Sequence, residues 1–192
     1  MNYHFVLAEK KLPMNSDWLN INQLFNRDIS NKLFDLAKIP NTFYISKLKQ
    51  LNLNNYKSEP LTNLFFLQGL SYLEDLDCCF NQLPNFEGLE QAIELRQLDA
   101  AFNALTSLQG LQNCHKLQSL NLQSNPIKDI SLLTHCKNLR IIHLNHTPIE
   151  HLRDLDELHD LEFLYIGDTK ISADEISRFA RLHPDCIIDN SL

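Results

Sequence analysis

The sequence repeats itself every 22 residues, and this periodicity constrains the fold more than any other feature. The repeat is anchored by a column of aliphatic residues: Leu76, Leu98, Leu120, Ile142 and Leu164. Each anchor follows another leucine by three residues: Leu73, Leu95, Leu117, Leu139 and Leu161. Three more columns lie two, five and seven residues after the anchors: Cys78, Ala100, Leu122, Leu144 and Ile166; Asn81, Asn103, Asn125, Thr147 and Thr169; Leu83, Leu105, Ile127, Ile149 and Ile171. Five columns in phase over five repeats indicate a chain built from stacked units.

Each unit contains a short segment in which apolar side chains occupy alternate positions, and this predicts a strand with one buried face. Stacking pairs these strands into a parallel sheet on the inner, concave side. Other apolar residues, such as Phe86 and Leu89, fill the space beneath the outer, convex turns. One unit cannot bury its own apolar face, so stability should come from interfaces between neighbouring units.

The column that begins with Asn81 suits a structural ladder, in which a buried side-chain amide satisfies turn backbone groups of adjacent units. Thr147 and Thr169 continue the column with a hydrogen-bond donor but should make fewer bonds. Cys114 and Cys136 stand at the final position of their repeats, where a small apolar residue is expected. These cysteines are interpreted as packing residues.

The pattern LxxLxLxxNxLxxLxxLxxC resembles the leucine-rich-repeat family, specifically its 22-residue class, known from regulatory subunits of protein phosphatase 1 and from bacterial internalins. The resemblance covers roughly residues 48–188. An irregular unit containing Leu48, Leu51 and Leu53 is interpreted as the first of six repeats over residues 48–171. The resemblance implies an α/β fold: a right-handed, horseshoe-shaped solenoid with a parallel concave sheet.

The ends of a solenoid expose apolar surface and strand edges, so caps are expected. At the C-terminus, Ser172-Ala173-Asp174-Glu175 reads as a capping box that starts a helix. Pro184 should stop this helix, and residues 186–188 can add a last short strand. The inner face of the helix is predicted to contain Ile176, Phe179 and Ala180. Residues 172–192 are therefore predicted to be a C-terminal helical cap.

At the N-terminus, residues 15–17 can cap a helix that begins near Trp18, and a second helical stretch covers about residues 31–38, before Pro40. The apolar side of the first helix would contain Trp18, Ile21, Leu24 and Phe25. Residues 1–47 are therefore predicted to be an N-terminal helical cap of the same single domain. A separate binding element in the first 45 residues stays open as an alternative.

Function should lie at the strand positions that the repeat leaves exposed. One concave column contains Asn52, Asp77, Asp99, Asn121, His143 and Tyr165. The column two residues earlier contains Gln50, Asp75, Gln97, Ser119, Ile141 and Phe163. The acids form a cluster in the N-terminal half, and the large apolar groups form a patch in the C-terminal half. The candidate protein-binding residues are Asp75, Asp77, Asp99, Ile141, His143, Phe163 and Tyr165.

Composition argues against several functional classes. The formal charge of −7 disfavours nucleic acid and anionic membranes as partners. We find no membrane span and no signal peptide in the sequence, which favours a cytoplasmic protein. The five cysteines include no CxxC motif and form no disulfide framework. We expect no cofactor.

Catalytic and metal sites are not expected either. The histidines from His135 to His151 are divided between the two surfaces, so no group has enough ligands for zinc. Cys79 is predicted to be exposed beside the strands, but His143 is three repeats away, about 14 Å by strand spacing. That separation is too large for a thiol–imidazole pair. The chain is therefore not expected to be an enzyme.

The sequence favours a scaffold or adaptor that binds a protein partner on its concave face and is monomeric alone. Two alternatives stay open. One is a bacterial effector that is secreted into a host cell cytosol and acts on a host protein. The other is a regulatory subunit of a phosphatase-like enzyme, which rests on the resemblance of repeat class alone.

Overall fold

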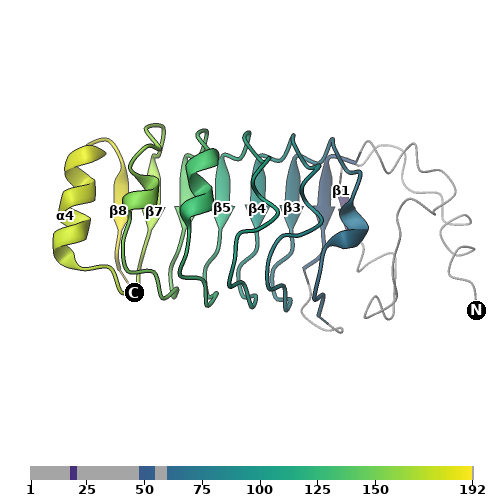
Figure 1. The fold of residues 1–192 in the computed structure, drawn as a ribbon, viewed down its shortest axis with the longest axis horizontal. Helices are drawn as coiled ribbons and strands as arrows, with labels where there is room; N and C mark the ends of the chain where they lie inside the picture. The colour runs from purple at the N-terminus through teal and green to yellow at the C-terminus, as the bar shows by residue number, and fades with distance from the viewer. Residues whose placement is uncertain (1–17, 21–47, 55–59, 192) are drawn as a thin grey trace, which may run out of the picture.

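The computed structural model describes residues 18–20, 48–54 and 60–191, and they contain one eight-stranded parallel sheet (Figure 1). The strands are hydrogen-bonded to one another in chain order, which confirms the predicted solenoid with its parallel sheet. The strands are β1 (Trp18–Asn20), β2 (Gln50–Asn52), β3 (Asp75–Asp77), β4 (Gln97–Asp99), β5 (Ser119–Asn121), β6 (Ile141–His143), β7 (Phe163–Tyr165) and β8 (Ile187–Asp189).

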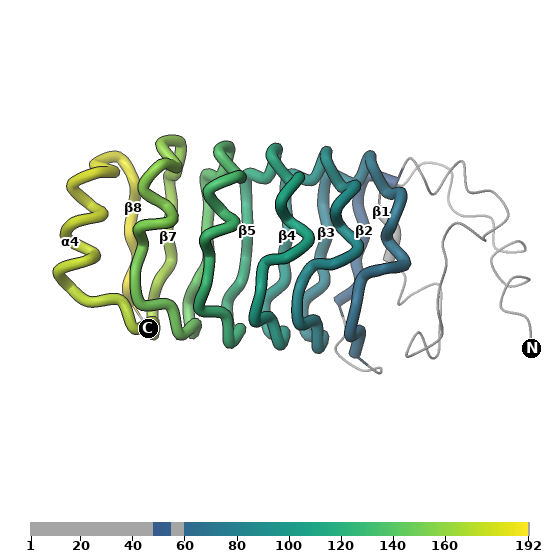
Figure 2. The backbone as a smooth tube through the Cα atoms, in the orientation of Figure 1, coloured from purple at the N-terminus to yellow at the C-terminus, as the bar shows by residue number. Residues whose placement is uncertain are grey.

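Turns and short helices form the opposite side of the solenoid (Figures 1 and 2). The helices are η2 (Phe65–Leu67), η3 (Ser131–His135), η4 (Arg153–Leu155) and, at the C-terminal end, α4 (Ala173–Leu182). The strand register follows the columns of the sequence, since Leu76 pairs with Leu98 and Leu98 with Leu120. Among the described residues, no helix has the length and apolar character needed to cross a bilayer.

The core lies between the sheet and the turns as one continuous apolar cluster. The central residue of each strand from β2 to β7 points into it and is at most 2% exposed. Successive units pack so closely that a side chain at Gly110 would meet the backbone carbonyl of Phe86, at 1.9 Å. Gly110 also has a φ of +107°, which other residues rarely adopt. Tight stacking and turn geometry therefore require glycine at this position.

The asparagine column forms hydrogen bonds between adjacent units. The side-chain oxygen of Asn125 accepts the N–H of Leu105 at 3.0 Å. Its amide nitrogen lies within 3.2 Å of the carbonyl oxygens of Ala100, Leu122 and Gln123. Asn81 and Asn103, the two preceding asparagines of the column, bond to the equivalent backbone groups of their own unit and of the unit before it. Each threonine of the column donates one bond, to the carbonyl three residues earlier.

A second column has an uncommon backbone conformation. The residue directly before each ladder position has a φ between 55° and 57°, in the left-handed region, although none of these residues is glycine. They are Phe80, Phe102, Ser124, His146 and Asp168. The two phenylalanine rings stack with centroids 4.6 Å apart. This conformation costs about 1–2 kcal/mol per residue, so the turn geometry of the repeat is maintained against a local penalty.

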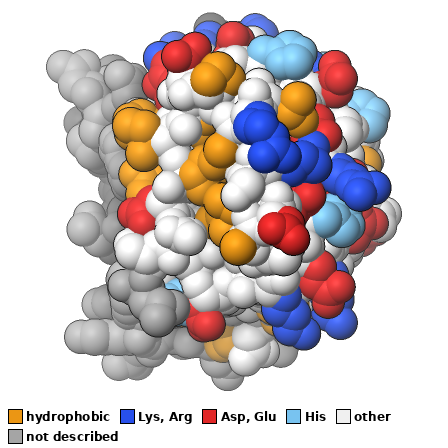
Figure 3. Space-filling model, turned by 90° about the vertical axis from the view of Figure 1, so that its left-hand side faces the viewer, with side chains coloured by type: hydrophobic (Ala, Val, Ile, Leu, Met, Phe, Trp, Pro, Cys, Tyr) orange, Lys and Arg blue, Asp and Glu red, His pale blue; other side chains and the backbone are white. Residues whose placement is uncertain are grey.

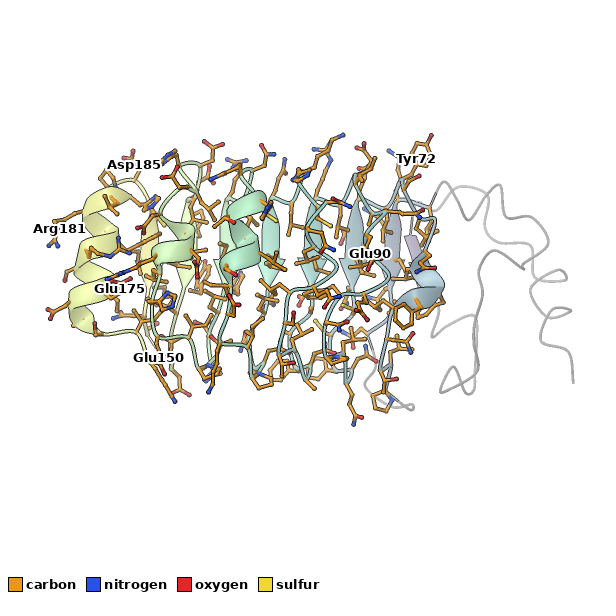
Figure 4. The ribbon with its side chains drawn as sticks, viewed as in Figure 1. Tyr72, Glu90, Glu150, Glu175, Arg181 and Asp185 are labelled. Carbon is orange, nitrogen blue, oxygen red and sulfur yellow. The ribbon has the colours of Figure 1, made fainter. Side chains whose placement is uncertain are left out.

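The C-terminal cap begins as predicted: the Ser172 hydroxyl accepts the N–H of Glu175 at the start of α4. Glu175 differs from a capping box, because its carboxylate accepts the N–H of Leu152 in the preceding repeat at 2.9 Å (Figure 4). Arg178 joins the same contact through two 2.8 Å bonds to the Asp156 carboxylate. Electrostatic bonds thus attach α4 to the last repeat.

Apolar packing completes this attachment. Phe179, on the inner side of α4, is fully buried. Its ring stacks on that of His183, the C-cap residue of the helix. The prediction for Ala180 is wrong: this residue is exposed, because it lies on the flank of the helix rather than on its inner face.

The N-terminal helix predicted to begin near Trp18 is wrong in its first turn. Residues 18–20 form β1, which pairs in parallel with β2 in the register Leu19 to Leu51. The physical reason is that β2 would otherwise have an unpaired edge, and backbone pairing outweighs a local helix signal. The remainder of the predicted cap, including the stretch at 31–38, lies outside the described residues.

Candidate binding face

The seven candidate binding residues all lie on one face of the sheet, in two rows that cross the strands. We call this surface the sheet face. Its first row contains Gln50, Asp75, Gln97, Ser119, Ile141, Phe163 and Ile187. Its second row contains Asn52, Asp77, Asp99, Asn121, His143, Tyr165 and Asp189. Polar residues occupy the first four places of both rows. Large apolar or aromatic residues follow them, except at the end of the second row, which is Asp189.

Two of the three clustered acids form internal hydrogen bonds. Asp77 accepts the backbone N–H of Cys79 at 3.1 Å, and Asp99 accepts the N–H of Ala101 at 3.2 Å. The asparagines of this row at Asn52 and Asn121 form the same turn, in which a side chain accepts a backbone N–H two residues on. These carboxylates therefore terminate strands, a role that sequence reasoning missed.

The third acid, Asp75, is partly buried, and its backbone N–H donates to the carbonyl of Lys49, but its carboxylate forms no hydrogen bond with the described residues. Burial raises the pKa of its carboxyl group, and repulsion from Asp77 and Asp99 raises it further. The acidic cluster thus contains one carboxylate available to a partner, and this one is protonated more readily than an ordinary aspartate.

The prediction that Cys79 is exposed is wrong. It is 5% exposed, and its Sγ lies 2.7 Å from Oδ1 of Asp99. Burial and the hydrogen bond to Asp99 raise the pKa of its thiol far above the ordinary value. A protonated, buried thiol is a poor nucleophile, so this position acts in packing and hydrogen bonding.

The C-terminal half of the sheet face brings apolar and aromatic groups together. The rings of His143 and Tyr165 stack almost in parallel, with centroids 4.2 Å apart and planes 1° apart. Ile141 lies beside Phe163 in the neighbouring row, and Phe163 lies beside Ile187. We call these five residues the C-terminal patch. All are partly or largely exposed, and Ile187 is 59% exposed.

Ile187 is the member of this patch that sequence reasoning missed. The sequence predicts a strand at 186–188, but the interval from Phe163 to Ile187 is 24 residues, so the regular columns end before it. If the rows had been extended by pairing the predicted strand with the strand before it, rather than by counting 22 residues, this residue would have been found.

His143 contributes an uncharged ring to the patch. Burial lowers the pKa of its imidazole, and the nearby Asp99 carboxylate opposes this shift only in part. The ordinary pKa of histidine is about 6.5, so the ring is predominantly neutral at neutral pH. The patch therefore presents an apolar surface rather than a positive charge.

The remaining histidines do not form a metal site in the described part of the chain. No group of three or more histidine, cysteine or acidic residues there could hold a metal ion. His146 lies 3.0 Å from Asp168 in an exposed pair beyond the ends of the strands. His115 contacts the backbone carbonyl of His135 on the other side of the solenoid.

Comparison with known sequences finds one matching family. Residues 93–135 and 115–158 match the family described as "Leucine Rich repeats (2 copies)". Among curated proteins, no sequence matches the chain.

Comparison with solved structures finds similar folds in bacterial proteins. An internalin (inlF) from Listeria monocytogenes has a TM-score of 0.66 and 21% identity, covering 79% of this chain and 44% of its own. Internalin C2 (inlC2) from the same species has a TM-score of 0.67 and 22% identity, covering 74% of this chain and 61% of its own. A leucine-rich-repeat protein from Leptospira interrogans has a TM-score of 0.68 and 23% identity, covering 76% and 38%. This chain therefore spans less than two thirds of each of these structures, and the likeness concerns the fold.

Proposed function

Because the chain is a leucine-rich-repeat protein, and this fold generally serves as a scaffold for protein interactions, we propose that it binds a protein partner through the C-terminal patch. The observation that carries the proposal is the adjacency of five apolar or aromatic side chains on the sheet face. Contiguous apolar groups that the fold does not bury are typical of contact sites.

The chemistry of the patch suits a protein surface with an apolar centre. Phe163 and Tyr165 are large, rigid side chains that lose little conformational entropy on burial, which is why such residues dominate binding energies. Stacking on His143 already orients the Tyr165 ring. By contrast, two of the acids in the other half of the face are engaged in turns. We therefore place the energetic centre of the interface in the C-terminal half.

The proposal is tested by capture of binding proteins from lysate with wild-type protein and with Phe163→Ala and Tyr165→Ala. A retained protein is identified and its Kd is measured with purified components. We expect either substitution to weaken this Kd by about 5–150-fold, which corresponds to about 1–3 kcal/mol.

The matched control is Glu157→Ala, because the Glu157 side chain is 72% exposed and follows η4 on the turn side. This variant should bind like wild type, and all variants should melt at similar temperatures. Loss of binding in the Glu157 variant, with full binding by both aromatic variants, would place the working surface on the turn side.

A further inference from the structure

The sheet ends at β8 with unused backbone hydrogen-bonding groups. After each strand from β2 to β7, the next residue donates its N–H to the following strand, as Leu144 does to Tyr165 and Ile166 to Asp189. Asn190 holds the same position after β8, and no described residue accepts its N–H. The carbonyl before each strand from β2 to β7 likewise accepts from the next strand, as Glu162 does from Ile187. Cys186 is the equivalent residue before β8, and no described residue donates to its carbonyl. The outer edge of β8 is therefore a template for one more strand.

The apolar layer beneath this edge is also incompletely covered. The inward residue of β8 is Ile188, which is only partly buried, whereas the inward residues of β2 to β7 are at most 2% exposed. Ile176 and Cys186 are partly buried against the same core, and Ala180 on α4 is exposed. Figure 3, which views this end of the molecule, shows hydrophobic side chains gathered in a stripe near its middle. An added strand would place an inward side chain over this stripe.

The position of α4 limits what can occupy the edge. α4 lies beyond β8 at the end of the solenoid, on the side of the turns (Figures 1 and 2). A second solenoid paired edge to edge would have to place its own layer of turns in the space that α4 occupies. One extended segment needs only the sheet layer, so the geometry favours a single strand.

The side chains along β8 define the chemistry of this strand. Ile187 presents an apolar neighbour on the sheet face, Ile188 an aliphatic neighbour on the core side, and Asp189 a carboxylate. Among the described residues, the Asp189 carboxylate has Ser191 as its one hydrogen-bonding partner, at Oδ1. A basic group beside it would complement this charge. The segment that fits this edge therefore has an apolar residue, an aliphatic residue and a basic residue, in this order along the chain.

We propose that the outer edge of β8 binds a single extended segment of a partner polypeptide by strand addition. The segment continues the sheet, places an aliphatic side chain beside Ile188 and places a basic residue beside Asp189. The backbone bonds supply affinity and the side chains supply selectivity, as in other cases of strand addition. This edge is distinct from the C-terminal patch except for Ile187, so the proposal does not depend on the function proposed above.

A direct probe is a capped, fluorescein-labelled peptide with the sequence of residues 139–147 of this chain, LRIIHLNHT. Paired in parallel as β6 pairs β7, its Ile-Ile-His core would place histidine beside Asp189. Binding is measured by fluorescence anisotropy at pH 6, where the histidine carries more positive charge than at pH 7.5. A second peptide with glutamate in place of this histidine should bind more weakly.

The decisive pair of variants is Asn190→Pro and Asn190→Ala. Both remove the same side chain, but only proline removes the outward N–H, and this N–H does not pair with β7. Asn190→Ala should bind the peptide like wild type. Asn190→Pro should bind the peptide at least about tenfold more weakly, because it loses the backbone hydrogen bond that the N–H of residue 190 would donate to the peptide. In wild-type protein, the amides of Ile188 and Asn190 should exchange more slowly with deuterium when the peptide is bound. That measurement does not depend on the folding of the proline variant.

The proposal is overturned if no saturable binding is found up to about 1 mM peptide, or if the proline and alanine variants bind equally. Unchanged exchange at both amides also overturns it. Dimerisation that increases with protein concentration and is abolished by Asn190→Pro would show that a second copy occupies the edge instead. If Phe163→Ala abolishes capture of the partner protein but leaves binding of the peptide unchanged, the edge of β8 and the C-terminal patch are separate binding sites.

Discussion

Single side chains join neighbouring repeats in this molecule, and Asn125 is the best-buried example, at 2% exposed. Its amide contacts backbone groups of two units, so its removal would leave several buried donors and acceptors without partners. We expect Asn125→Ala to lower the free energy of unfolding by about 1–3 kcal/mol. Thr169→Ala should cost less, because Thr169 makes one bond and is less buried. Urea denaturation of both variants checks this, and equal losses would contradict the ladder role.

The left-handed column permits a substitution that should increase stability. Ser124 has a φ of 55°, a conformation that glycine adopts without steric cost. The relief of about 1–2 kcal/mol exceeds the entropic cost of glycine, so Ser124→Gly should stabilise the protein by up to about 1 kcal/mol. The control is Ala104→Gly, at an exposed position without positive φ, which should destabilise the protein. Thermal unfolding in which both variants shift in the same direction would contradict this account.

Residue roles could be predicted from the sequence where the repeat determines them. The spacing placed the candidate residues in the correct rows, because strand register copies the 22-residue period. It could not show that Asp77 and Asp99 bond to the backbone two residues on, because exposure of a position does not reveal where its side chain turns. The burial of Cys79 likewise depends on contact with the Asp99 carboxylate in the next repeat.

At the scale of elements, α4 is attached to the last repeat by a group that titrates at low pH. The hydrogen bonds from Arg178 hold the pKa of Glu175 at about 2, assisted by the N–H of Leu152 and opposed by burial. An unfolded glutamate titrates near pH 4.3. Because the folded pKa is the lower one, the stabilisation is fully present above about pH 4.3 and is lost as pH falls toward 2.

This titration predicts the behaviour of Glu175→Gln. The variant should be less stable than wild type at pH 6, and the difference should shrink progressively from pH 4.3 to pH 2. Urea denaturation across this range measures it, with Glu157→Gln as the exposed control. A difference that stays constant with pH would show that the carboxylate charge does not hold α4 in place.

The two ends of the solenoid differed in how well their elements could be predicted. α4 begins at a local signal, since the hydroxyl of Ser172 accepts the N–H of Glu175 three residues later and caps the helix directly. β1 depends on a partner about 30 residues further along the chain, because its pairing is with β2. A local pattern that also suited a helix could not reveal this pairing.

The whole molecule depends on the closure of its C-terminal end. Phe179 is fully buried against the last repeat, and residues beneath it belong to one continuous core. Deletion of residues 172–192 should expose this core and cause aggregation at micromolar concentration. Light scattering and thermal unfolding check the result. A truncated protein that stays monomeric with an unchanged melting temperature would show that the segment is not a cap.

The fold as a whole could be predicted because the same unit recurs, so each repeat supplies independent evidence for the same strand and turn. The stepwise order of the sheet also has a mechanical consequence. Since every strand is bonded to its neighbours in chain order, a protein held by its two ends in an optical trap would lose strands from an end inward. Each regular unit of 22 residues would lengthen the tether by about 70 Å, so the regular repeats would give extension steps of equal size.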